Sequence, residues 1–367
     1  MSNQLRVYTK VLKTLKRMMP GQTQGHVVTL AMMITGIVMG RRAQLAPMST
    51  QVPYATKDKS IEKRMRRWVK NGRVEIEAYF LPYAQALLAG LADNTLLLAM
   101  DGSTVGRGCM VLMVGVVYHK RALPIAWVVY RGKKGHASAE THISVLKLVH
   151  ALIPDGADVI LLGDGEYDSV DMLTWIEHYT DWGIVARTAS DTQVYSDGEW
   201  ISLAELGIQP DGLMSLPEAL FTRQAFGPIH LIAWWDQAYD HPLYLVTNLE
   251  LAQEACYWYR RRYRIETLFS DKKSRGFQID KSHLSDPARL ARLFIATSLA
   301  YIWMICLGLQ VIQVHQTHLI DRADRNDKSM FRLGLDWLSY LLKWGKPFTV
   351  QFCVPLCSPF VNSESVR

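Results

Sequence analysis

Two aspartates occupy positions from which they could share a divalent metal ion. Asp101 and Asp164 each close a run of apolar, β-favouring residues, LLLAMD and VILLGD. If these strands are adjacent and parallel, both carboxylates lie at the same edge of the sheet, where α/β proteins place their ligands. Hard cations such as Mg²⁺ prefer oxygen ligands, usually one or two carboxylates with water and substrate phosphate. Because strands of many folds end in Asp, the pair alone is weak support for a metal site.

A third acid, Glu266, lies in a segment with helical spacing, residues 257–276. That spacing places Tyr259, Arg262 and Lys273 on the same helical face as the glutamate. Buried without partners, these groups would be costly. Facing a metal and a phosphodiester, Glu266 would be a ligand and the two cations would be phosphate contacts.

The elements around these residues predict a mixed α/β domain. Three apolar runs, 96–101, 109–118 and 123–130, read as sequential antiparallel strands. A helix over 138–152, a strand over 159–164, a helix over 169–178 and a strand over 183–188 follow. This order, with a long helix after it, is the ribonuclease H-like layout, in which a crossover helix brings the fourth strand beside and parallel to the first.

More residues separate Asp164 from Glu266 than this layout requires, so we expect an insertion. Residues 191–240 contain strand-like pieces with Gly and Pro turns, which predicts a β-rich insertion. A strand over 242–249 then returns the chain to the sheet.

The N-terminal fifth is strongly basic. Residues 1–74 hold 15 Lys and Arg but two acids, whereas the rest holds 26 basic and 32 acidic residues. Such segregation suggests a polyanionic partner, nucleic acid or an anionic membrane surface. Helices are expected over 5–18 and 26–39, and a third after Ser60 as its N-cap. Its basic face would lie on DNA, or would simply be solvated; its cations are Lys63, Arg64, Arg66, Arg67 and Lys70.

The pattern Y-x2-R-x3-E-x6-K, met by Tyr259, Arg262, Glu266 and Lys273, together with Asp101 in MDGS and Asp164 in GDGEYD, resembles the DDE transposases of bacterial insertion sequences. It is most similar to the cut-and-paste family of insertion sequence 4, whose members carry the YREK signature. The resemblance extends from Leu96 to about Val314, and the basic helical N-terminus agrees with the family's DNA-end-binding region.

The resemblance implies a polynucleotidyl transferase and endonuclease that uses two Mg²⁺ or Mn²⁺ ions, held by Asp101, Asp164 and Glu266. Tyr259, Arg262 and Lys273 would grip phosphates beside the scissile bond. The partners would be double-stranded DNA, namely the terminal inverted repeats and the target, and a second copy of the chain. The enzyme would work in the bacterial cytoplasm, at the nucleoid and not in a membrane.

Family members close and reopen a hairpin at the element end, which needs an aromatic wedge against a flipped base. Trp200, Trp234 and Trp235 are the candidates, although tryptophans of this kind also fill small β cores.

Three parts are therefore expected: a helical DNA-end-binding domain over 1–92, a ribonuclease H-like core over 93–320, and a C-terminal helical segment over 321–367. The predicted helix over 330–344 has an apolar side that would either mediate dimerisation or pack on the core.

Two further features test this interpretation. Residues 295–314 are uncharged and about as long as a bilayer span, but a fully buried helix behind a sheet has the same pattern and is preferred. The five cysteines form neither a CxxC pair nor a disulfide framework.

Two rival functions remain. GDGEYD and DGSTV resemble loops of haloacid dehalogenase-type phosphatases, in which Asp101 would be a nucleophile, although Ser103 stands where those enzymes use a second acid. A transposase-derived protein that binds DNA without cutting it is the other alternative, although all three acids are present.

Overall fold

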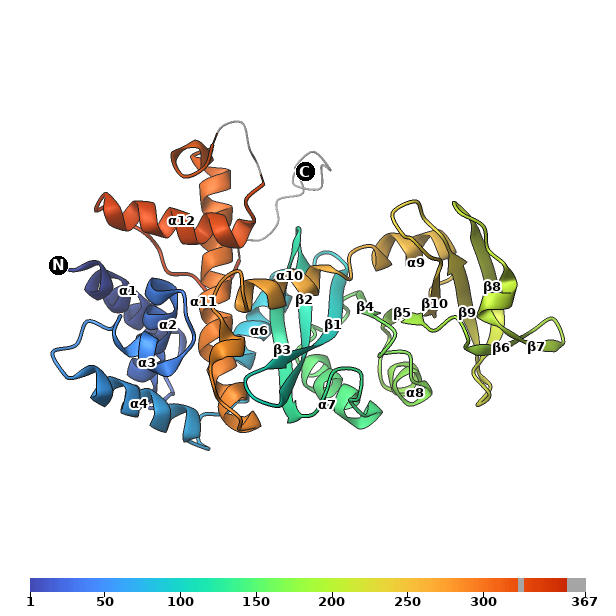
Figure 1. The fold of residues 1–367 in the computed structure, drawn as a ribbon, viewed down its shortest axis with the longest axis horizontal. Helices are drawn as coiled ribbons and strands as arrows, with labels where there is room; N and C mark the ends of the chain where they lie inside the picture. The colour runs from blue at the N-terminus through green and yellow to red at the C-terminus, as the bar shows by residue number, and fades with distance from the viewer. Residues whose placement is uncertain (323–326, 355–367) are drawn as a thin grey trace.

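The computed structural model describes residues 1–322 and 327–354. One ten-stranded sheet lies at its centre, with strand order β3-β2-β1-β4-β5-β10-β9-β8-β6-β7. Helices gather at one end of the molecule and the β-rich part extends to the other (Figure 1). The N-terminal helices are α1 (Asn3–Met18), α2 (Gln24–Gly40), α3 (Leu45–Ser49), α4 (Asp58–Lys70), α5 (Ile76–Tyr79) and α6 (Leu81–Ala89).

The first five strands have the predicted ribonuclease H-like topology. They are β1 (Leu96–Val105), β2 (Cys109–Tyr118), β3 (Arg121–Arg131), β4 (Val159–Gly163) and β5 (Gly183–Thr188), with α7 (Ala139–His150) and α8 (Val170–Tyr179) as crossovers. The strands β1, β2 and β3 pair antiparallel, whereas β4 is parallel to both β1 and β5. The fold class expected from the sequence is therefore confirmed.

The insertion extends the same sheet. Its strands are β6 (Gln193–Ser196), β7 (Glu199–Ser202), β8 (Leu213–Phe221) and β9 (Phe226–Trp234). The returning strand β10 (Leu243–Thr247) pairs antiparallel with β5 on one side and with β9 on the other. The β-rich insertion is thus joined to the ribonuclease H-like core through continuous backbone hydrogen bonds.

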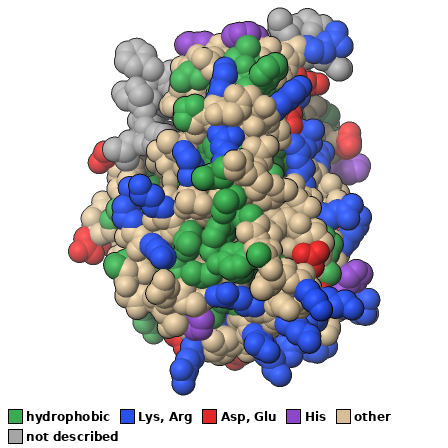
Figure 2. Space-filling view, turned by 90° about the vertical axis from the view of Figure 1, so that its left-hand side faces the viewer, with side chains coloured by type: hydrophobic (Ala, Val, Ile, Leu, Met, Phe, Trp, Pro, Cys, Tyr) green, Lys and Arg blue, Asp and Glu red, His purple; other side chains and the backbone are tan. Residues whose placement is uncertain are grey.

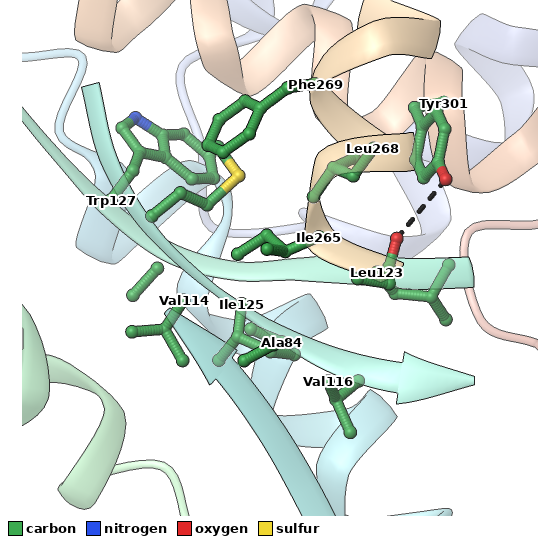
Figure 3. Packing of buried hydrophobic residues seen from close by; sticks show 14 of the residues in the cluster. Ala84, Val114, Val116, Leu123, Ile125, Trp127, Ile265, Leu268, Phe269 and Tyr301 are labelled. Carbon is green, nitrogen blue, oxygen red and sulfur yellow. Dashed lines mark hydrogen bonds between the residues drawn. The ribbon is translucent and has the colours of Figure 1, made fainter. Parts of the chain in front are cut away.

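Two helices follow β10: α9 (Ala252–Tyr259) and α10 (Arg264–Lys272). Together they include most of the segment 257–276 in which the sequence predicts a helix. The apolar side of α10 packs on β3: Ile265, Leu268 and Phe269 lie against Ile125 and Trp127 (Figure 3). These side chains are almost completely buried, so hydrophobic burial fixes α10 on the sheet.

The helix α11 (Pro287–Gln313) is long and apolar enough to cross a membrane by length and composition. However, 89% of its apolar 18-residue window is buried inside the protein. It begins at Asp286, whose side chain accepts a hydrogen bond from the Arg289 amide at 2.9 Å. The Tyr301 hydroxyl donates to the Ala122 carbonyl on β3, shown as a dashed line in Figure 3. These contacts place α11 behind the sheet, as the buried-helix interpretation expects.

The C-terminal helix α12 (Met330–Lys343) crosses α11 at very close range. Its apolar side, which includes Phe331 and Leu335, is buried within the chain. After it, residues 346–350 run along α1, where the Lys10 ammonium and the Thr14 hydroxyl donate to the carbonyls of Phe348 and Val350. The apolar face of α12 is therefore covered by the chain's own core.

The N-terminal helices also pack directly on α11. The Arg292 guanidinium donates to the carbonyl of Val74 at 2.9 Å and to that of Val69 at 3.2 Å. The helix α4 begins at Asp58, with Lys57 as its N-cap, so the expected cap at Ser60 is wrong by three residues.

The expected domain limits at 92 and 320 stay predictions. Among the described cysteines all four are free, and Cys357 lies outside the described residues.

Candidate active site

The strand register places Asp101 and Asp164 at the same level of the sheet. The parallel pairing of β1 with β4 ends at Ala99 and Leu162, and each aspartate lies two residues beyond. One detail differs from the sequence prediction: β1 continues past Asp101 to Val105, because it remains paired with β2. Asp101 therefore lies within its strand, at the point where β4 leaves it.

The Asp101 carboxyl is buried and polarised by its neighbours. It is 3% exposed, and burial raises its pKa to about 6, helped by the nearby Asp164 carboxylate. The Lys134 ammonium, 3.9 Å from Asp101 Oδ1, opposes that rise. The Gly102 amide donates to Asp101 Oδ1 at 2.7 Å. A nearby cation would favour the charged form of Asp101.

Arg262 joins the third acid to this pair. Its Nη2 atom lies 2.7 Å from Glu266 Oε1, and its Nη1 atom lies 3.8 Å from Asp164 Oδ2. The arginine side chain is 15% exposed, and its Nη1 atom has no hydrogen-bond partner among the described residues. The guanidinium thus occupies the space between two carboxylates. Within residues 1–322 and 327–354, no group of three His, Cys, Asp or Glu side chains is close enough to hold a metal ion.

The expectation of one continuous helix over 257–276 is wrong. Helix α9 ends at Tyr259 and α10 begins at Arg264. The intervening turn has i→i+3 hydrogen bonds, such as Arg262 to Tyr259 at 2.9 Å, which wind the chain more tightly than an α-helix. Its arginines contact separate partners: Arg260 pairs with Asp236, and Arg264 donates to the His119 carbonyl. The single helical stripe therefore does not form, although Arg262 and Glu266 still contact each other.

The two remaining members of the predicted signature lie against the same acids. Tyr259 is buried, which raises its pKa to about 12, and its ring centroid is 6.0 Å from the Arg262 guanidinium. The Lys273 ammonium donates to Ser103 Oγ at 2.6 Å, and burial lowers its pKa. Because Ser103 is on β1, this bond holds the end of α10 beside the Asp101 strand.

Residues that the sequence reasoning left aside also lie here. Tyr167 is 1% exposed, its hydroxyl has no hydrogen-bond partner, and its pKa is raised by burial and then by the Asp101, Glu166 and Asp164 carboxylates. In the turn after β4, the Glu166 amide donates to Asp164 Oδ1 at 3.2 Å. The run GDGEYD signalled a turn, but nothing in it showed that Tyr167 would point inward.

The predicted DNA-contact residues of α4 form an exposed basic strip. Lys63, Arg66, Arg67 and Lys70 are exposed, and Arg66 pairs with Glu62. Arg64 is partly buried, because its Nε atom donates to Thr29 Oγ1 at 2.9 Å. Figure 2 shows the face of the molecule at this end, where Lys and Arg side chains lie around an apolar strip.

The three candidate wedge residues have different surroundings. Trp234 is 6% exposed and the Arg260 guanidinium lies 5.0 Å from its ring, so it fills the β core. Trp200 and Trp235 are half-buried; Trp235 donates to the Tyr239 carbonyl at 3.1 Å, and Arg223 covers the Trp200 ring at 4.6 Å.

Comparison with known proteins identifies the family of this chain. The family model described as "Transposase DDE domain" matches residues 90–303. Among solved structures, the chain is similar to a piggyBac transposase determined by cryo-EM in a synaptic complex with hairpin DNA. The identity is 11%, the TM-score is 0.45, and the alignment covers 93% of this chain and 79% of that one. No curated protein matches.

Proposed function

Because the chain belongs to the family with the transposase DDE domain, whose model covers more than half of it, we propose that it is a cut-and-paste DNA transposase of the insertion sequence 4 type. As a member of that family it is a transposase, an enzyme of the polynucleotidyl transferase and nuclease class. The observation that carries the finer proposal is the placement of Asp101 and Asp164 two residues beyond the last β1–β4 pair, with Arg262 between Asp164 and Glu266.

Transposase domains of this family use divalent metal ions, and the carboxylates of this site fit such an ion. Asp101 has a pKa of about 6 because it is buried beside a second carboxylate, an arrangement that a cation relieves. Two carboxylates with water and substrate phosphate meet the usual demand of Mg²⁺. Glu266, 55% exposed, would join them once its side chain leaves Arg262. Mg²⁺ or Mn²⁺, two ions in our proposal, would supply an activated oxygen nucleophile and charge neutralisation at the leaving oxygen.

The chain's own cations would position the DNA strand. Arg262 and Lys273 are partly or largely buried beside the acids and lie within one short segment. A phosphodiester that enters the site would accept hydrogen bonds from Arg262, which is well suited to bidentate contact with phosphate. The Tyr259 hydroxyl, protonated at neutral pH, would donate to an adjacent phosphate.

The partners follow from the same proposal. The exposed cations of α4, Lys63, Arg66, Arg67 and Lys70, would bind the backbone of the terminal inverted repeats. Arg64 would contribute less, because its guanidinium already contacts α2. Trp200 or Trp235 would stack on a flipped base if the ends close into hairpins. A homodimer would bring two ends together, and the enzyme would work in the bacterial cytoplasm, at the nucleoid.

The proposal is tested by incubating the purified protein with the DNA that flanks its own gene, with Mg²⁺, with Mn²⁺ and with EDTA. Denaturing gels report nicks and hairpins. Metal-dependent cleavage at a discrete end is the expected result. Binding without cleavage under every metal condition would instead identify a DNA-binding protein that no longer cuts.

A further inference from the structure

A hollow of about 720 Å³ adjoins the acids on the side away from β1. Its walls come from three segments: the turn after β4, the end of β5 with the residues that follow, and the chain that enters β10. They are lined by Asp164, Gly165, Glu166, Arg187, Thr188, Ala189, Ser190, His241, Pro242 and Tyr244, with Lys134 and Gly135 at the rim. The hollow is therefore continuous with the acid site through Asp164.

Two side chains that line this hollow, Arg187 and His241, could hold a phosphate. Arg187 and His241 are exposed, and within the described part of the chain neither side chain makes a hydrogen bond or an ion pair. Lys134 is 59% exposed, and its one ion pair is the 3.9 Å contact with Asp101. An unpaired arginine beside a nuclease-type acid pair has the chemistry to hold a phosphate oxygen.

The position of Arg187 connects the hollow to the signature residues. Its charge acts on the Tyr259 hydroxyl, as do the charges of Arg262 and Asp164. Arg187 pairs in the sheet with Leu245 of β10, so its backbone is held by the neighbouring strand. A DNA strand with one phosphate at Arg262 would therefore reach Arg187 without leaving the protein surface.

The hollow also lies at the root of the insertion. Residues 189–190, which lead into the insertion, and residues 241–242, which lead out of it, both line the hollow. The Thr188 and Thr192 hydroxyls lie 2.9 Å apart in a hydrogen bond, and Thr188 lies close enough to Asp168 to oppose the burial-driven rise of its pKa. These contacts connect the start of the insertion to the segment that carries Asp164. The walls of the hollow are therefore held close to the acids.

We propose that this hollow is a binding subsite for one nucleotide of the cleaved DNA strand, in which Arg187 and His241 hold a phosphodiester neighbouring the scissile one. This inference rests on the proposed function and names positioning residues for it. The acids would remain the reacting centre. Arg187 and His241 would determine which phosphodiester of the DNA strand lies at the acids.

The test combines protein variants with uncharged phosphates. The terminal DNA end is synthesised with a single methylphosphonate at each of the phosphates around the cleavage position. Affinity is measured in EDTA, and cleavage with Mn²⁺, for the wild type, Arg187→Ala and His241→Ala. Lys147→Ala is the matched control, because Lys147 is an exposed cation on α7 outside the hollow.

We expect one methylphosphonate position to weaken wild-type binding about tenfold and to have little further effect on Arg187→Ala. Arg187→Ala should also cut at shifted or multiple positions, whereas Lys147→Ala should behave as the wild type. If Arg187→Ala and His241→Ala match Lys147→Ala at every position while the wild type cuts normally, the subsite is refuted. If the wild type does not cut at all, it is the proposed function that fails, and the binding data in EDTA still decide whether Arg187 contacts a phosphate.

Discussion

Arg262 partly neutralises the negative charge of the site. The guanidinium lies between Asp164 and Glu266, and Lys134 lies near Asp101, so each acid has a protein cation close by. An incoming divalent ion must compete with these side chains. A DNA phosphate that draws Arg262 away would remove that competition, which links DNA binding to metal binding.

Replacing Arg262 by Gln should therefore strengthen metal binding by the DNA-free protein. We expect Mn²⁺ to bind about tenfold more tightly, since a hydrogen bond to a charged group contributes roughly 1.5 kcal/mol. Strand cleavage should nevertheless fall, because a phosphate contact is lost. Electron paramagnetic resonance of free Mn²⁺ measures the affinity, with Lys147→Gln as the control. Unchanged Mn²⁺ affinity in Arg262→Gln would show that the arginine does not compete with the ion.

A second residue, Lys272, is buried and has no carboxylate partner in the part of the chain that the structure describes. It is fully buried, its Nζ atom donates to Ser298 Oγ at 2.6 Å, and desolvation lowers its pKa well below the usual value. Between this lowered pKa and about pH 10.4, the folded state binds fewer protons than the unfolded state, so stability rises with pH across that window.

Lys272→Met should remove this dependence and raise the free energy of unfolding at pH 7 by about 1–3 kcal/mol, because the replacement is apolar and of similar shape. Chemical denaturation at pH 7 and pH 10 measures the change. The exposed Lys147→Met should stay within about 0.5 kcal/mol of the wild type. A loss of stability in Lys272→Met would mean that the Ser298 hydrogen bond outweighs the desolvation of the amine.

Individual site residues were predictable to different degrees. The acids and the cations of the signature could be identified because their types and spacing have chemical meaning. Tyr167 and Arg187 could not, since their roles depend on how the turn after β4 meets β5. Such contacts join segments that are not neighbours in the chain, and no local pattern encodes them.

At the scale of elements, the sequence predicted the strands of the core well and the helices less well. Alternating and continuous apolar runs predicted β1 to β5 and their pairing order. The break between α9 and α10 was missed, because helical periodicity is still present across 260–263. At the break Arg260 and Arg264 contact separate parts of the fold, Asp236 and the His119 carbonyl, and such contacts cannot be read from local periodicity.

The crossing of α11 and α12 depends on two glycines. A Cβ atom at Gly334 would lie 1.8 Å from the Met304 carbonyl oxygen, and one at Gly308 would lie 1.9 Å from that of Met330. Gly334→Ala should force the helices apart and cost about 3 kcal/mol, the upper range for overpacking. Thermal unfolding measures this, and Gly72→Ala, where no atom lies within 4 Å, is the control. Equal melting temperatures would contradict this close packing.

In the whole molecule, the basic helices are fixed to the catalytic-type core. Arg292 on α11 bonds to Val69 and Val74, and the segment after α12 runs along α1. DNA held by α4 would therefore be held in a defined position relative to the acids. The sequence revealed the charge asymmetry, but only the fold shows these connections.

Neutralising the exposed cations of α4, Lys63, Arg66, Arg67 and Lys70, to Gln should weaken DNA binding nearly uniformly across sequences. The slope of log affinity against log salt should flatten by up to about 3.6, since each of the four lost phosphate contacts contributes roughly 0.9. Fluorescence anisotropy over a salt series measures it. Asp101→Ala serves as the control and should keep the wild-type slope. An unchanged slope in the α4 variant would assign DNA binding to another surface.

The central claim is that Asp101, Asp164 and Glu266 form the reacting centre. The most direct test is metal-dependent cleavage of the terminal DNA by Asp101→Ala, Asp164→Ala and Glu266→Ala, with DNA affinity measured in parallel. The proposal predicts loss of cleavage in each variant with wild-type affinity, because loss of a metal ligand spares the basic surface. Retained cleavage in all three variants would contradict it.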